Sequence, residues 1–154
     1  MKLDRLREEV EFGLGNLNKI HERIKEFARA SVELSILQSA LTYECIGYYN
    51  ALEHLIVRVL KGLGKPIPSG PSSHKDTLRL FGEILTKVGM LDTQSAVEFI
   101  EELMAFRHVT TKIYGFLIDW GKLKSVVDQI QQRHGLLETL FDELMQRLER
   151  NKEE

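Results

Sequence analysis

The residues of this chain that could do chemistry are concentrated in one short segment, FRHVTTKIYG, at residues 106–115. An arginine offers a rigid fork of donors to phosphate oxygens, a lysine adds a point charge, and a histidine normally titrates near neutrality. If the segment is helical, Arg107, Thr111 and Tyr114 share one face. His108 and Lys112 then lie one turn apart on the adjacent face. This pattern predicts an anion-binding surface.

A second interpretation fits the same residue types, namely a solvated helix end whose basic side chains complement the helix dipole. The chain has a formal net charge of −2, which argues against a general nucleic-acid coat protein. The charge is uneven, since residues 107–124 sum to +3 and residues 54–79 to +4 when Lys and Arg are counted against Asp and Glu. Ordinary variation of surface charge would also give sums of this size, so both interpretations stay open.

The rest of the sequence offers no recognised catalytic or metal-binding motif. Cys45 has no flanking base, and we expect a small core residue rather than a nucleophile. We expect Glu53 and His54 to form a surface or partly buried polar pair. The histidines are dispersed and form no HExxH motif: His21, His54, His74, His108 and His134. We therefore predict neither a metal nor a cofactor.

The length and composition of the chain favour one globular domain over residues 1–154. Hydrophobic residues make up 43% and charged residues 29%, which is enough apolar material for one core. A single cysteine excludes an internal disulfide framework and favours a reducing compartment. The N-terminal residues are charged, and no apolar stretch is long enough to span a bilayer. We expect a cytoplasmic protein without a membrane segment.

Apolar residues recur at spacings of three and four, which predicts an all-α fold. We expect about five helices in an antiparallel bundle, over residues 3–27, 34–63, 74–88, about 93 to 106 and beyond, and about 119–148. The expected boundary signals are an N-cap at Ser31, a left-handed Gly89, and caps at Asp92 or Thr93 and near Asp119. All three prolines fall in the main loop, residues 64–73. An apolar stripe wider than one chain can cover would make the bundle a homodimer.

Two segments resemble a known family. FRHVTTKIYGFLID is similar to the signature of HEPN proteins, and specifically to a HepT-like branch with Phe-Arg-His-Val, three residues, Tyr-Gly, and then Leu and Asp. YYNALEHLIVRVLKGLGKPIPSGPSSHKDTL resembles the second helix of that branch, its Leu-Pro-x-Gly loop and the histidine that opens its third helix. With the order of the helices, the resemblance covers nearly the whole chain.

The resemblance implies a helical bundle that forms a homodimer, with the motif helices of two protomers facing each other across a cleft. Active members of the family are metal-independent ribonucleases, and their motif maps onto Arg107, His108, Lys112 and Tyr114. Arg107 would stabilise charge on the phosphorane transition state, and Tyr114 would help to position the phosphate. The implied partner is a minimal nucleotidyltransferase in a toxin-antitoxin pair, and that partner can transfer AMP to the motif tyrosine, here Tyr114.

The chain departs from the motif at Lys112, which replaces the catalytic histidine. RNA cleavage needs proton-transfer groups with a pKa near the working pH, whereas an ordinary lysine has a pKa of ~10.4. Burial of Lys112 beside Arg107, or the use of His108 as the base, could restore proton transfer.

We therefore expect a HEPN-type component of a toxin-antitoxin system that binds phosphate or RNA at an Arg107/Tyr114 cleft, with weak or no nuclease activity. With the histidine replaced, the roles in the pair could be reversed, so that this chain restrains its neighbour. The alternatives are an active metal-independent RNA endonuclease toxin and a purely structural helical dimer.

Overall fold

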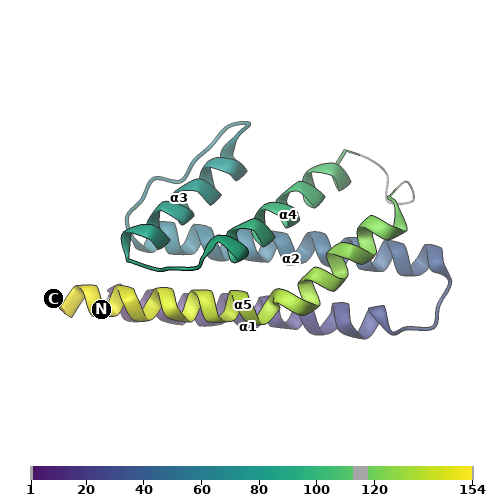
Figure 1. The fold of residues 1–154 in the computed structure, drawn as a ribbon, viewed down its shortest axis with the longest axis horizontal. Coiled ribbons are helices and arrows are strands. Elements are labelled where there is room, and N and C mark those ends of the chain that lie inside the picture. The colour runs from purple at the N-terminus through teal and green to yellow at the C-terminus, as the bar shows by residue number, and fades with distance from the viewer. Residues whose placement is uncertain (1, 113–117, 154) are drawn as a thin grey trace.

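The described part of the chain in the computed structural model, residues 2–112 and 118–153, folds into five helices and contains no strand (Figure 1). The bounds are α1 Lys2–Ala28, α2 Leu34–Gly62, α3 Ser73–Lys87, α4 Gln94–Thr110 and α5 Trp120–Glu153. This confirms the all-α bundle predicted from the apolar spacing. None of the described helices combines the length and the apolar character that crossing a bilayer requires.

Three long helices and two short ones make up the bundle. Figure 1 shows α1, α2 and α5 lying lengthwise, with the two chain termini at the same end, while α3 and α4 lie on the opposite side of α2 from α1. The most extensive contact is between α1 and α2, and α2 also contacts α3, α4 and α5. The largest fully buried side chains are Tyr48, Phe81, Phe99 and Phe141. The core therefore forms around the buried face of α2.

The end of α3 and the start of α5 lie where the glycine and aspartate signals of the sequence predicted them. Gly89, just after α3, has a φ of 82°, the left-handed conformation that favours glycine at a helix end. Asp119 precedes α5, and its Oδ2 accepts a hydrogen bond from the amide of Lys122 at 3.0 Å. This bond satisfies one of the free amides in the first turn of α5, as an N-cap does.

The predicted N-cap at Ser31 is wrong. Helix α2 begins at Leu34 with Glu33 in the N-cap position, and no side-chain hydrogen bond caps it. Residues 30–33 are exposed and bury no apolar surface that would favour extending the helix backwards. Thr93 does occupy the N-cap position of α4, again without a side-chain bond, and Asp92 before it has a φ of 59°.

Two glycines let α1 and α2 approach each other closely. A Cβ atom on Gly62 would lie 2.7 Å from Cδ1 and 3.2 Å from Cγ of the buried Leu6 side chain. A Cβ atom on Gly13 would lie 2.7 Å from Cδ1 of Leu55. A side chain at either position would force its leucine neighbour to shift, and the shift is larger at Gly62, where Cγ of Leu6 is also close.

We expect Gly62→Ala to lower the free energy of unfolding by about 1–2 kcal/mol, because Leu6 must move away from the new methyl group. Gly15→Ala on α1 is the control. Nothing lies within 4 Å of its Cβ position, so the higher helix propensity of alanine should stabilise the protein by ~0.5–1 kcal/mol. Urea unfolding measures both changes, and a stabilising Gly62→Ala would contradict the close packing.

A buried polar cluster lies where α1, α2 and α5 meet. The rings of His21 and His134 stack with centroids 4.2 Å apart, and the Tyr48 hydroxyl is hydrogen-bonded to Nδ1 of His134 at 2.9 Å. Burial lowers the pKa of both imidazoles, and proximity to His21 lowers that of His134 further. The carboxylate of Glu138 lies 3.6 Å from Nε2 of His134 and partly opposes this shift in pKa. The pair is therefore held in its neutral form.

We expect the free energy of unfolding to decrease as the pH falls below about 6.5, the pKa of an unperturbed histidine. In that range the unfolded chain takes up protons that the buried His21 and His134 do not, so protonation favours unfolding. Urea unfolding between about pH 7.5 and 5.5 measures the slope. His21→Gln should make the slope shallower, whereas His54→Gln, at an exposed imidazole, should leave it unchanged. Equal slopes in both variants would contradict the conclusion that the buried histidine pair causes this pH dependence.

Candidate functional site

The segment identified in the sequence lies partly on α4 and partly beyond its end. Arg107 and His108 belong to the last turn of α4, which ends at Thr110, and Lys112 is exposed in the following turn. Tyr114 lies outside the described residues, so its predicted place beside Arg107 stays a prediction. Among the described residues of the segment, the helical register holds as far as Thr110, where α4 ends.

Local hydrogen bonds account for the end of α4. The hydroxyl of Thr110 donates to the carbonyl of Arg107 at 3.0 Å, and that of Thr111 donates to the carbonyl of His108 at 3.1 Å. The amide of Lys112 bonds to the carbonyl three residues earlier, not four, which tightens the last turn. Hydroxyl side chains compete in this way with regular helical bonding.

Asn50 of α2 fixes the position of Arg107. The Arg107 Nε donates to Asn50 Oδ1 at 2.9 Å, across 57 residues of sequence. The side chain is half-buried, and this bond uses one of the five N–H groups of a guanidinium. The remaining donors can bind an anion from a fixed position.

Arg107 and His108 line a cavity of about 470 Å³ between α4, the first turn of α3 and the loop before it. Among the described residues that line this cavity there are two imidazoles, an arginine and a lysine, and no carboxylate. The volume is within the range of small-molecule sites. The lining residues are Pro71, Ser72, His74, Lys75, Met104, Ala105, Arg107 and His108. We call this the Arg107 cavity.

A carboxylate behind the cavity orients one of its imidazoles. Glu53 Oε2 accepts a hydrogen bond from the Tyr49 hydroxyl at 2.6 Å and lies 2.5 Å from His74 Nδ1. Burial, followed by the bond to Glu53, raises the pKa of Tyr49 well above its usual value, so the phenol stays protonated and donates. Because an ionised carboxylate only accepts, Nδ1 of His74 carries the proton in this pair. Nε2 is then the nitrogen left to act on a ligand.

Sequence reasoning identified Arg107 and His108 but missed the residues that complete the site. Asn50, Glu53 and His74 come from α2 and α3 and meet α4 only in the folded chain. Two signals pointed towards them: Tyr49 and Glu53 are four residues apart on one helix face, and the family-like segment 48–78 contains all three residues. Glu53 is partly buried and His54 is exposed, as expected for two polar neighbours, and the hydrogen bonds of Glu53 go to Tyr49 and His74.

Other candidate residues are structural. Cys45 is buried in α2, where desolvation raises the pKa of its thiol to about 12, and the prediction of a core residue is confirmed. Within residues 2–112 and 118–153, no group of three or more His, Cys, Asp or Glu side chains is placed to hold a metal ion.

Comparison with known proteins gives one match. The family described as HepT-like protein matches residues 40–150, which is more than two thirds of the chain and includes every residue of the Arg107 cavity. The comparison with curated proteins found no match, and neither did the comparison with solved structures.

Proposed function

The chain belongs to the HepT-like protein family, and from this premise we propose that it acts in the cytoplasm as the HEPN-type component of a toxin-antitoxin system. In this proposal the protein binds phosphate groups of RNA in the Arg107 cavity and has weak or no nuclease activity.

The observation that carries the proposal is the charge of the Arg107 cavity. Arg107, fixed by Asn50, and Lys75 supply cationic donors from opposite walls, and the described residues that line the cavity include no carboxylate to compete with a phosphate. A guanidinium held in place binds phosphate in a bidentate manner and loses little entropy on binding. A structural dimer would need no such cavity.

The weak nuclease activity follows from the position of Lys112. This residue is exposed beyond the end of α4 and is not among the side chains that line the cavity. Burial beside Arg107, the first route by which a lysine could replace the catalytic histidine, is therefore not supported. Arg107 can still bind phosphate, but the histidine position of the motif supplies no base for RNA cleavage.

A second candidate function, the active endonuclease, is favoured by the imidazoles of the same cavity. His74, oriented by Glu53, could take the proton of a 2′-hydroxyl while the oxygen attacks phosphorus, and His108 could protonate the departing 5′-oxygen. The products would be a 2′,3′-cyclic phosphate and a 5′-hydroxyl, and no metal takes part in either proton transfer.

We expect Arg107→Ala to weaken the binding of a 12-nucleotide single-stranded RNA by about tenfold or more, measured by fluorescence anisotropy in chelator. Arg133→Ala is the matched control, because Arg133 contacts Ser95 on α4 and is not among the residues that line the cavity. Equal affinity of wild type and Arg107→Ala would contradict the proposed site.

Gel analysis of the same samples tests for catalysis. If the wild type cleaves the RNA and both Arg107→Ala and His74→Ala do not, the protein is an endonuclease instead.

We further propose a homodimer and a minimal nucleotidyltransferase partner. Large apolar side chains remain exposed along the first half of α2, namely Leu34, Ile36 and Tyr43, the last with 74% of its surface accessible. Exposed apolar surface of this kind supports contact with another chain. In the proposed pair, the nucleotidyltransferase transfers AMP from ATP to the Tyr114 hydroxyl, which loses its proton, and pyrophosphate is released.

Co-expression with the product of a neighbouring nucleotidyltransferase gene should give a complex that co-purifies. Intact-mass spectrometry should show adenylylated protein, and Tyr114→Phe should abolish the modification. Peptide mapping of the modified wild-type protein is the control, and it should find AMP on Tyr114 and none on the exposed Tyr43. The proposed partnership would be overturned if the co-expressed chain purified without the nucleotidyltransferase, or if the Tyr114→Phe variant were modified to the same extent as the wild type.

A further inference from the structure

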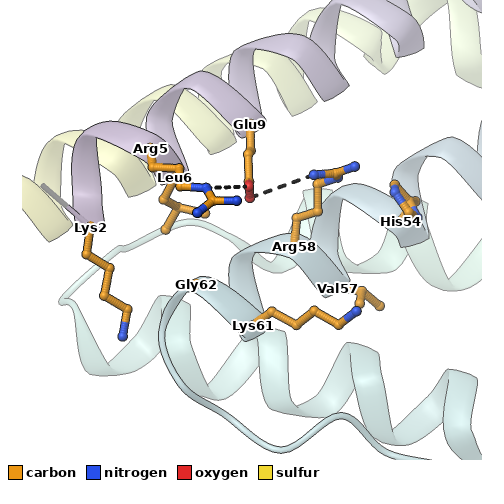
Figure 2. Close-up of a pocket in the computed structure, with 9 residues that line it drawn as sticks. All are labelled: Lys2, Arg5, Leu6, Glu9, His54, Val57, Arg58, Lys61 and Gly62. Atoms are coloured by element: carbon orange, nitrogen blue, oxygen red, sulfur yellow. Dashed lines mark ion pairs between the residues drawn. The ribbon is translucent and has the colours of Figure 1, made fainter.

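A second basic cavity lies between the last turns of α2 and the first turns of α1. It has a volume of about 390 Å³, and its described lining contains four cationic side chains and one carboxylate, Glu9. Figure 2 shows these side chains projecting from the two helices around the groove. The lining residues are Lys2, Arg5, Leu6, Glu9, His54, Val57, Arg58, Lys61 and Gly62. We call this the basic groove.

Glu9 holds the two arginines of the basic groove near each other. Its carboxylate oxygens lie 3.5 Å from Arg5 Nε and 3.8 Å from Arg58 Nη1, one arginine on α1 and the other on α2 (Figure 2). Both separations exceed a normal N–H···O hydrogen bond, so the attraction is coulombic. One carboxylate thus lies between two guanidinium groups, and it competes with any anionic ligand for their donors.

One face of α2 connects the basic groove with the Arg107 cavity. Asn50, His54, Arg58 and Lys61 are spaced by four, four and three residues, so they lie along the same face. All four are at least partly exposed, and Asn50 holds Arg107. The distance along the helix axis from Asn50 to Lys61 is ~16 Å, at ~1.5 Å per residue. Cationic groups therefore stand at both ends of one open polar face.

We propose that the basic groove binds the backbone phosphates of the same RNA strand whose other end occupies the Arg107 cavity. This inference rests on the function proposed above and extends it from one phosphate site to a track. A strand stacked at ~3.4 Å per nucleotide covers ~16 Å with about five nucleotides.

The chemistry of the groove favours a polymer backbone over a free nucleotide. Apart from the imidazole of His54, the described lining contains no aromatic ring on which a base could stack. Arginine and lysine side chains spread over two helices are the usual contacts to successive phosphates, and they carry no base specificity. The groove would therefore add affinity and fix the direction of the strand.

The test compares RNA of two lengths in the full-length protein. In R58Q/K61Q both charges are removed while most of each aliphatic stem is kept. This variant should bind a 12-nucleotide RNA about tenfold more weakly, and the slope of log K against log salt should fall by about 1.4, or ~0.7 for each lost phosphate contact. Binding of a trinucleotide, which cannot reach from the Arg107 cavity to the groove, should not change. K25Q/K124Q is the matched control, since both lysines are in exposed ion pairs outside the groove.

A second variant is expected to change the RNA affinity in the opposite direction, and loss of folding cannot cause tighter binding. Glu9→Gln removes the competing carboxylate and should tighten binding of the 12-nucleotide RNA several-fold. If R58Q/K61Q binds the 12-nucleotide RNA with unchanged affinity and salt slope, while Arg107→Ala binds it more weakly as expected, the groove proposal is overturned. The proposal for the Arg107 cavity then remains intact. Absence of RNA binding by the wild type would overturn both proposals.

Discussion

Helix α2 packs against all four other helices, and the rest of the structure depends on this arrangement. Its buried face supplies much of the core, including Tyr48, Leu52 and Val59, each fully buried. On the open side of α2, two polar residues hold groups from other elements. Asn50 holds Arg107, while Glu53 at the margin holds His74. Stability and the candidate site are thus built on two sides of one helix.

The helices could be predicted because their cause is local and periodic. Apolar spacing placed each of the five described helices, and glycine and aspartate signals placed the end of α3 and the start of α5. The start of α2 was predicted wrongly because Ser31 has the chemistry of an N-cap, whereas the helix begins at Leu34 without a side-chain cap. Residues 34–36 are as exposed as residues 31–33, so burial does not select the start either. The chemistry of one side chain could therefore not fix this boundary.

Prediction of the site was limited by long-range contacts. Arg107 and His108 stood out because cationic side chains interrupt an apolar pattern. The partners that give them a function are 57 residues away in the case of Asn50, and on another helix in the case of His74. Neither asparagine nor a lone histidine is unusual in a helical protein, so residue type could not identify them. Only the meeting of α2, α3 and α4 makes them part of one site.

The arrangement also separates two tasks that the family motif combines. In that motif, arginine, histidine and tyrosine lie together in one short segment, so phosphate binding and proton transfer depend on the same turn. Here Arg107 keeps its place at the end of α4, while the residue at the histidine position, Lys112, lies exposed beyond the helix. The imidazole with an orienting carboxylate is His74, which reaches the cavity from the opposite wall. In the function proposed above, phosphate binding depends on α4 and α2, and any proton transfer in the described cavity depends on His74 or His108.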